Sequence, residues 1–265
     1  MEALESQPIA DPSLRIGVWN LECVVFRDRN PARLDFLRAR DADIWVLTKT
    51  HTEIDLRTSH PHFTHSAPRN RSANSMHWVS IWSRFPVEPI ESDDVRTAIA
   101  LIETPVGRLL VCGTVWPWHS DIGEYPGDKA WANWARQAPV IAQQGALWSR
   151  PKAQYPDSIL CIAGDLNMTF GGPYPYYSRA GRLEAALAMQ AHDLICTTAW
   201  ARMPDGKLDR APIDHVLLPY DIASHTRVCD TWRGRPREPD RLSDHSGLIV
   251  EVVSPSDRLR GKAGA

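Results

Sequence analysis

The sequence has little that would place it in a specialised class of protein. Its 265 residues contain no uninterrupted apolar run near the ~20 residues that a membrane-spanning helix needs. Residues 1–5 are acidic and no apolar stretch follows them, so we expect no secretory signal. We find no internal repeat, low-complexity linker or shift in composition. These absences predict a cytoplasmic protein without a membrane segment.

The chain also has little net charge and few cysteines. The chain has 30 basic and 32 acidic residues, a net charge of -2, so no long-range field draws it to nucleic acid or membrane. A local basic patch would still suffice for phosphate contacts. The five cysteines are odd in number and form no C-x-x-C pair, which favours reduced, buried thiols. The sequence does not indicate an oligomeric state.

Short apolar segments bounded by turn residues predict a β-rich chain. The expected strands are 14–19, 44–48, 78–83, 97–103, 108–115, 159–164, 213–218, 226–232 and 246–253. The expected helices are 31–40, capped at Asn30-Pro31, 128–149, kinked at Pro139, and 179–191. Strands mixed with a few helices predict two packed sheets flanked by helices. We expect one domain over residues 14–253, with tails at 1–13 and 254–265.

Four polar motifs follow or begin predicted strands. They are Trp19-Asn20-Leu21-Glu22, Gly164-Asp165-Leu166-Asn167, Ile213-Asp214-His215 and Ser243-Asp244-His245. Polar groups at strand ends gather at one rim of a sheet, where they can bind a divalent cation and a phosphate ester. Each motif alone also fits an ordinary turn, but four together favour a functional site.

The side chains of these motifs suggest distinct chemical tasks. Alternation along an extended chain places Asp165 and Asn167 on one side, facing one ligand. Asp244 and His245 offer a metal ligand and a general base, and Asp214 is suited to orient the imidazole of His245. His215 begins an apolar strand, so we expect it to be packed rather than catalytic.

The order of these motifs resembles that of the endonuclease/exonuclease/phosphatase superfamily. Asp41-Ala42-Asp43-Ile44 and Ile81-Trp82-Ser83-Arg84-Phe85-Pro86-Val87 add to the likeness, which extends over about residues 14–253. The superfamily includes DNase I-like nucleases, abasic-site endonucleases, inositol-polyphosphate 5-phosphatases, neutral sphingomyelinases and deadenylases. The resemblance implies a four-layer α/β sandwich of two packed, mixed or antiparallel sheets flanked by helices. It also implies hydrolysis of phosphate esters with Mg²⁺ or Mn²⁺.

The resemblance implies roles for individual residues. Asp165 would position or deprotonate the attacking water, and Asn167 would bind the phosphate or hold that water. His245, paired with Asp214, would touch the scissile phosphate, and Asn20 would orient the cluster. Glu22 and Asp244 would lie near the metal.

Three residues in the loops are further candidates. His119 lies near the place where the superfamily often has a residue that assists the phosphate or the leaving group. The alternative is a loop histidine stacked among tryptophans. Trp118 is suited to stack on a base and Arg69 to bind a substrate phosphate, although packing and a solvated surface explain them equally well.

Lys49 departs from the pattern of the superfamily. The principal metal ligand is a glutamate in an "L-Q-E" pattern, and here the matching segment is Leu47-Thr48-Lys49. An ammonium group would repel Mg²⁺ by roughly several kcal/mol at close range. Lys49 would then replace the cation, or Glu22 and Asp244 would hold the metal weakly, or the chain would bind a phosphorylated ligand without catalysis.

The favoured function is metal-dependent hydrolysis of a phosphodiester or phosphomonoester by an activated water. Nucleic acid is slightly preferred as substrate, because the chain has no membrane-binding feature of a sphingomyelinase and no lysine-rich pocket for an inositol polyphosphate. The alternative is a silent pseudoenzyme that binds a phosphate ligand, with Lys49 in place of the metal-binding glutamate.

Overall fold

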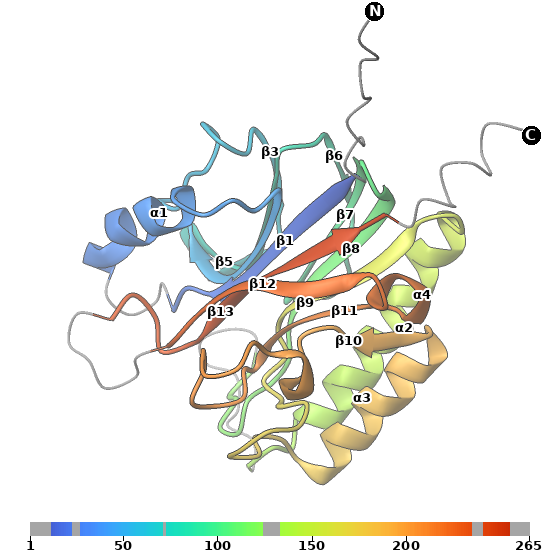
Figure 1. Cartoon of the computed structure of the whole chain (residues 1–265). Helices are drawn as coiled ribbons and strands as arrows, with labels where there is room; N and C mark the ends of the chain where they lie inside the picture. Colours follow the sequence, from blue (N-terminus) through green and yellow to red (C-terminus); the bar gives the residue numbers. More distant parts are fainter. Residues whose placement is uncertain (1–11, 23–26, 71–72, 124–132, 235–240, 255–265) are drawn as a thin grey trace, which may run out of the picture.

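Two β-sheets packed face to face form the centre of the molecule (Figure 1). The computed structural model describes residues 12–22, 27–70, 73–123, 133–234 and 241–254. The first sheet has the order β12 (Thr226–Trp232), β13 (Gly247–Val253), β1 (Ser13–Asn20), β2 (Ile44–His51), β5 (Ala73–Ser83) and β3 (His62–His65), with β4 (Pro68–Asn70) also on β5. The second has the order β10 (Leu194–Cys196), β11 (Asp214–Pro219), β9 (Ile159–Asp165), β8 (Gly107–Val115), β7 (Thr97–Thr104) and β6 (Val87–Ile90).

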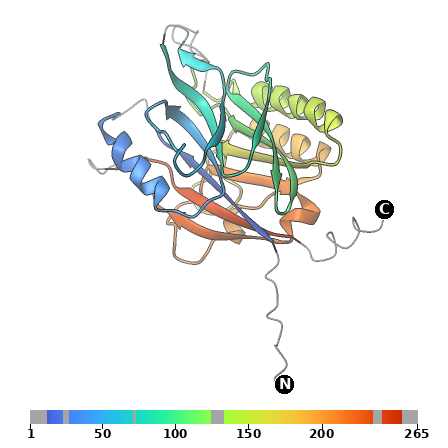
Figure 2. The same cartoon turned by 90° about the horizontal axis from the view of Figure 1, so that it is seen from above.

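Helices cover the outer faces of both sheets and complete four layers (Figure 2). The described helices are α1 (Asn30–Arg38), α2 (Gln137–Gln154), α3 (Arg179–Ala191) and α4 (Tyr220–Ala223), with 3-10 turns at Arg27–Arg29 and Trp200–Arg202. Leu37 of α1 packs with Trp45 and Leu47 on the first sheet. Trp148 of α2 and Ala185 of α3 belong to a cluster on the second sheet. The predicted sandwich of two sheets flanked by helices is confirmed.

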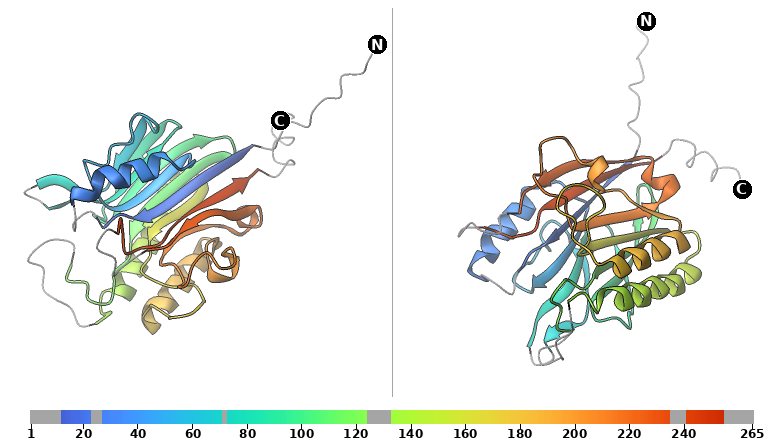
Figure 3. Two further views of the ribbon diagram at one scale, coloured as in Figure 1. Left: turned by 60° about the vertical axis from the view of Figure 1, so that its left-hand side comes forward. Right: turned by 90° about the horizontal axis from the view of Figure 1, so that it is seen from below.

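The cores explain why the central strands are apolar along their whole length. Residues 44–47 of β2 are fully buried, because α1 covers one face of the strand and the second sheet covers the other. On the second sheet, α2 and α3 lie side by side (Figures 2 and 3). Gly145 lets them approach, since a Cβ there would lie 2.8 Å from that of Ala188.

The structure corrects two predicted helix starts. Of the expected helix 128–149, residues 128–132 lie outside the described part, and α2 runs from Gln137 to Gln154. Pro139 falls in its first turn, where a missing N–H costs nothing, so the expected kink is wrong. In α1, Arg29 is the N-cap and Asn30 is already helical. The Asn30 amide instead donates to Glu53.

The strands and thiols need smaller corrections. Strands β3, β4, β6 and β10 were not expected, because each has only three or four residues and weak alternation. The hairpin joining β7 to β8 at Thr104 and Gly107 is as predicted. Cys112, Cys161 and Cys196 are buried free thiols, whereas Cys229 is exposed where β12 changes register. Within the described parts, none of the helices has the length and apolar character needed to cross a bilayer.

The strand register brings the polar motifs to one rim of the sandwich. β2 runs parallel to β1, and β9 runs parallel to β8, so the ends of β1, β2 and β9 can share a rim. β11 is antiparallel to β9, and its first residue, Asp214, pairs directly with Asp165, the last of β9. The pairing of β13 with β1 brings residues just before β13 beside the end of β1.

Candidate active site

Asp165 is the centre of a buried polar cluster, which comprises Asn20, Lys49, Asp165, Asn167, Asp214 and His245. Its Oδ2 accepts a hydrogen bond from Asn20 Nδ2 at 2.8 Å and lies 3.2 Å from Lys49 Nζ. Its Oδ1 accepts from the backbone N–H of Asn167 at 3.2 Å. Burial alone would raise the pKa of Asp165, but the charges of Lys49 and His245 outweigh it and lower that pKa. Asp165 is therefore an ionised hydrogen-bond acceptor at neutral pH.

Asp214 and His245 form a closely spaced acid–imidazole pair. Asp214 Oδ2 lies 2.6 Å from His245 Nδ1, and the Asp214 side chain is fully buried. Burial raises the pKa of Asp214 to about 6 despite the neighbouring imidazole. Burial lowers the pKa of His245, but Asp214 and Asp165 reverse this effect and raise it to about 9. The shared proton therefore resides on the imidazole, whose Nε2 faces Asn20.

Asn20 holds the two halves of the cluster together. Its Oδ1 accepts from the backbone N–H of Glu22 at 2.9 Å, which fixes the amide so that Nδ2 faces Asp165 and His245. Ser243 donates to the Asn20 carbonyl at 2.6 Å and accepts from the N–H of His245 at 3.1 Å. Trp19 Nε1 donates to the carbonyl of His245 at 3.0 Å. These bonds tie the segment before β13 to the end of β1.

Asn167 is held by its surroundings in the left-handed backbone region, with a φ of 43°. Its Nδ2 donates to the carbonyl of Trp116 at 2.9 Å, and its own carbonyl accepts from the buried Gln137 side chain at 3.1 Å. Glu22 and Lys49 also have positive φ, at 51° and 48°. Half of the six non-glycine residues with positive φ in the described chain thus lie at this site. Such strained positions gather where a structure over-determines its geometry, as at functional sites.

Lys49 lies near the end of β2, with its ammonium group directed into the cluster. Besides its contact with Asp165, Nζ lies 5.0 Å from the centre of the Trp118 ring. Only 17% of the side chain is exposed. The expected glutamate position is therefore filled by an ammonium group that already has a carboxylate partner.

Glu22 and Asp244 flank the cluster without meeting each other directly. Glu22 Oε1 is 3.0 Å from Arg241 Nη2, so its carboxylate is already paired with a cation. Asp244 Oδ1 lies 3.9 Å from His245 Nε2 and is buried without a hydrogen-bond partner. Of the two expected metal ligands, only Asp244 has an unused oxygen facing the cluster.

Aromatic and basic side chains lie beside the cluster. Trp118 is half-buried between Lys49 and Trp78, whose ring centre is 6.3 Å from that of Trp118. Arg69 stacks on Trp78, with its guanidinium carbon 3.9 Å from the Trp78 ring centre. Its Nη1 is buried and has no hydrogen-bond partner. Burial, with repulsion by Arg96, lowers the pKa of Arg69 to about 10, so it remains a cation at neutral pH.

His119 is exposed and belongs to the mouth of the site rather than to the cluster. Its ring contacts the Trp134 ring edge to face, with the ring centres 5.5 Å apart, and its backbone N–H donates to the Tyr176 hydroxyl at 3.5 Å. His215 lies in the interior, as expected: Nε2 contacts the Met168 carbonyl at 2.9 Å and Nδ1 contacts Thr198 at 2.9 Å. Burial lowers the pKa of His215 to about 4.

Three residues that the sequence analysis did not single out complete the surroundings. Burial and the charges of Asp165 and Asp244 raise the pKa of Tyr176, although the hydrogen bond from the His119 backbone N–H lowers it, so the phenol of Tyr176 lies within the electric field of the cluster. The others are Gln137 and Arg241, described above. Only Tyr176 had a sequence signal, since it stands among three tyrosines after a glycine pair in the loop following Asn167.

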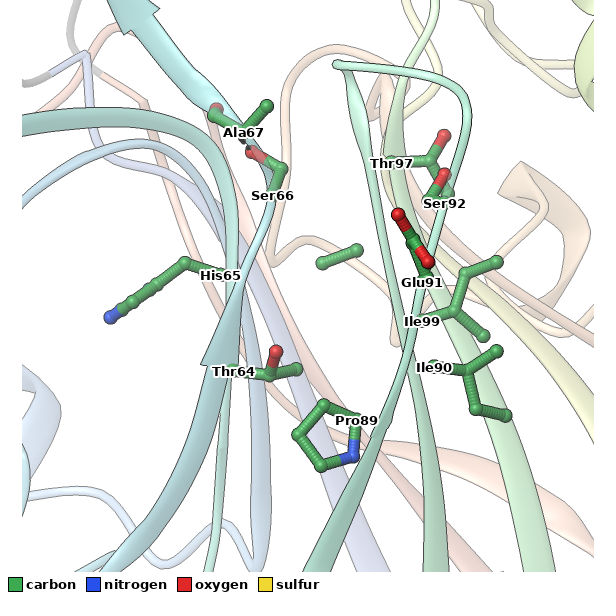
Figure 4. A pocket seen from close by; sticks show the side chains of 11 residues that line it. Thr64, His65, Ser66, Ala67, Pro89, Ile90, Glu91, Ser92, Thr97 and Ile99 are labelled. Atoms are coloured by element: carbon green, nitrogen blue, oxygen red, sulfur yellow. Dashed lines mark hydrogen bonds between the residues drawn. The ribbon is translucent and has the colours of Figure 1, made fainter. Parts of the chain in front are cut away.

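One hollow in the described structure lies away from the polar cluster. A cavity of ≈ 410 Å³ lies between the strands β3 and β6, with Thr64, His65, Glu91 and Thr97 among its lining residues (Figure 4). None of the residues that line it belongs to the polar cluster. Its wall offers no group of converging charges, so the chemistry of the molecule points to the cluster instead.

The cluster contains three ligand atoms close enough for one metal ion. The ligand atoms of Asp165, Asp214 and His245 all lie within 4.8 Å of one another. The same groups already have partners, however, because Lys49 and Asn20 contact Asp165 and the imidazole contacts Asp214. Mg²⁺ requires oxygen ligands in near-octahedral geometry and is repelled by a nearby ammonium group. The residues as they stand do not fit a divalent ion at the Lys49 position.

The arrangement suits an anion that enters the cluster from its exposed side. Lys49, Asn20 and His245 present hydrogen-bond donors, and Asp165 presents an ionised acceptor for a water proton. Arg69 adds a cation beside an aromatic surface. Such a set can orient a tetrahedral anion and a water against each other.

Comparison with solved structures shows similar folds. The endonuclease domain of TRAS1, a telomere-specific non-LTR retrotransposon, aligns with a TM-score of 0.58 at 13% identity, covering 90% of this chain and 98% of that one. An AP endonuclease from Archaeoglobus fulgidus aligns with a TM-score of 0.61 at 15% identity, covering 89% and 98%. TDP2 from Caenorhabditis elegans aligns with a TM-score of 0.59 at 16% identity, covering 91% and 74%.

Comparison of sequences gives a narrower likeness. The RNA-directed DNA polymerase from the mobile element jockey of Drosophila melanogaster is 27% identical over 114 residues. That match covers 41% of this chain and spans only 12% of the length of the polymerase. No family model matches the chain.

Proposed function

Because the chain has the fold of the endonuclease/exonuclease/phosphatase, DNase I-like superfamily, we propose that it is a phosphoesterase that hydrolyses nucleic acid. The single observation that carries the proposal is the convergence of Asn20, Asp165 and the Asp214–His245 pair on one point. The similar proteins include two endonucleases and a mobile-element polymerase, which favours nucleic acid over other phosphate esters.

In the proposed reaction, a water held by Asp165 and Asn167 attacks the phosphorus in line with the leaving group. The new bond joins the water oxygen to phosphorus, the ester bond to the leaving oxygen breaks, and Asp165 takes the water proton. The His245 imidazolium, oriented by Asp214, and the Asn20 amide donate to the phosphate oxygens. The leaving oxygen is protonated at the exposed mouth, where His119 lies.

The remaining contacts would select the substrate. Arg69 would bind a neighbouring phosphate through its unpartnered Nη1, and Trp118 would stack against a base. Glu22 would hold Arg241 in place, and Asp244 would bind a water or the substrate through its free oxygen. Mg²⁺ or Mn²⁺, which the resemblance implies as cofactor, has no part in these steps, because Lys49 stands against Asp165.

A second candidate follows from the same contact. If the Lys49 ammonium holds Asp165 too firmly for it to accept a proton, the chain binds a phosphorylated ligand without cleaving it. Phosphate binding without turnover in the natural protein would favour this silent alternative.

The proposal is tested by hydrolysis of a substrate panel with and without Mg²⁺ and Mn²⁺. The panel contains single strands, duplex DNA, duplex with an abasic site, RNA, bis-p-nitrophenyl phosphate and inositol phosphates. We expect cleavage of a nucleic acid and a loss of about 10²- to 10⁴-fold in Asp165→Asn. Asp157→Asn is the matched control, because Asp157 is exposed just before the other end of β9. No cleavage under any condition, or equal rates in both variants, would refute the proposal.

A further inference from the structure

The end of β2 places a fixed positive charge inside the polar cluster. Lys49 lies near the end of β2, a strand buried along most of its length, and its backbone has a φ of 48°, which interrupts the regular alternation. Strand β5 pairs with Thr48 and Thr50 on either side of it, and β1 pairs with Thr48. The Lys49 side chain is 17% exposed, so it stays near Asp165 and Trp118 instead of extending into solvent.

The carboxylates around Lys49 are matched by cations within the chain itself. Asp165 pairs with Lys49 at 3.2 Å, Asp214 with His245 at 2.6 Å, and Glu22 with Arg241 at 3.0 Å. Asp244 is the remaining carboxylate beside the cluster in the described structure. A site that binds a divalent cation instead gathers oxygen ligands whose charge the ion neutralises. Here that neutralisation is already supplied by side chains.

From this geometry we infer that the Lys49 ammonium is a built-in cation that binds the scissile phosphate, so that the site works without a divalent metal ion. The inference rests on the proposed function and assigns Lys49 a direct catalytic contact. A lysine ammonium has three N–H donors. One is directed at Asp165, and the others are available to a phosphate oxygen.

The reaction balances without a metal. Water attacks phosphorus, the ester bond to the leaving oxygen breaks, the water proton passes to Asp165, and the leaving oxygen takes a proton from solvent at the exposed mouth of the site. Lys49 keeps its own protons and stabilises the negative charge that develops on the phosphate oxygens. The Asp165–Lys49 contact also fixes the distance between the proton acceptor and the bound phosphate.

The test measures both metal binding and cleavage. The natural protein, Lys49→Glu and Lys49→Met are freed of metal with EDTA and titrated with Mn²⁺, whose binding is followed by electron paramagnetic resonance. The best substrate of the panel is then offered in EDTA and in Mg²⁺. Lys207→Glu is the matched control, because Lys207 is exposed and makes the same change of charge.

We expect the natural protein and Lys207→Glu to cleave in EDTA within about two-fold of the rate in Mg²⁺ and to bind no Mn²⁺ at the cluster. Lys49→Met should lose at least about 100-fold, the scale of a removed transition-state donor, and Lys49→Glu should bind Mn²⁺. Because the natural protein carries the main comparison, a variant that fails to fold does not remove the test.

Two results would overturn the inference, and they differ in whether the proposed function is also overturned. Cleavage by the natural protein only with Mg²⁺, or specific Mn²⁺ binding to it, would end the inference and leave the proposed function intact. No cleavage by the natural protein in either condition, with cleavage by Lys49→Glu in Mg²⁺, would end both and favour the silent alternative.

Discussion

At the scale of the residue, the site is governed by how buried charges are paired. Asp165 is fully buried, and an isolated carboxylate there would take up a proton at neutral pH. Lys49 and His245 keep it ionised, so it remains able to accept a proton from water. Lys49, at the position where the resemblance implies a metal-binding glutamate, therefore helps to keep Asp165 in its ionised form.

The imidazole of His245 should titrate well above the usual range. Its pKa is raised from 6.5 to about 9, with Asp214 the strongest raising influence. We expect nuclear magnetic resonance to place the His245 titration near pH 9 in the natural protein and clearly lower in Asp214→Asn. His65, whose pKa burial lowers to about 4, should be unchanged. A His245 titration that does not move would contradict the assigned pairing.

The same shift fixes the sign of its effect on stability. Because the folded pKa of His245 lies above 6.5, protonation of this residue stabilises the fold fully below pH 6.5. That contribution is lost as the pH rises through about 9. Asp214 acts in the same sense at lower pH: its pKa is raised from 3.8 to about 6, so the stability gained from its protonated form is lost as the pH rises through about 6.

At the scale of the element, the end of β9 depends on a glycine. Gly164 has a φ of 138°, and a Cβ there would lie 2.1 Å from the Thr114 carbonyl of β8. Gly164→Ala should therefore lower the free energy of unfolding by at least about 2 kcal/mol and displace Asp165. Gly206→Ala, also at positive φ but with no atom within 4 Å of the added Cβ, should cost about 1 kcal/mol. Urea unfolding measures both, and equal costs would contradict the steric argument.

The elements that could be predicted from the sequence are those whose own residues show a clear apolar pattern. Strands β2, β8 and β9 are buried on both faces, so their apolar runs mark them. β3 and β6 are short, partly exposed and interrupted by polar residues or proline, and only their neighbours β5 and β7 make them strands. Residues 133–136 were expected to be helical because the apolar spacing of Trp134 and Ala138 continues before Gln137, but they form turns and α2 begins at Gln137.

At the scale of the whole molecule, substrate binding would depend on local rather than overall charge. The net charge is -2, yet Lys49 lies beside Trp118 and Arg69 lies beside the neighbouring Trp78. Arg69→Ala should weaken binding of a labelled single strand and reduce the slope of log affinity against log salt by about 0.7, one phosphate contact. Fluorescence anisotropy measures this in a non-cleaving background. Arg108→Ala, exposed near the opposite end of β8, is the control and should change neither.

The whole site was only partly visible in the sequence. Asn20, Asp165, Asp214 and His245 were found because each stands at a strand end, and strand ends converge by topology. Gln137, Arg241 and Tyr176 act from loops or a helix start, and no periodicity links them to the strands they serve. The partner of Lys49 could not be predicted either, since the contact depends on the packing of two different sheets.

The position of β1 has a consequence for the life of the chain. This first strand lies between β2 and the last strand, β13, so Ser13 pairs with Val253. During synthesis, one edge of β1 therefore stays unpaired until β13 has followed it. His245 stands just before β13 in the chain. The polar cluster is therefore complete only once β13 has paired with β1, so local folding of the β1–β2 region alone cannot assemble it.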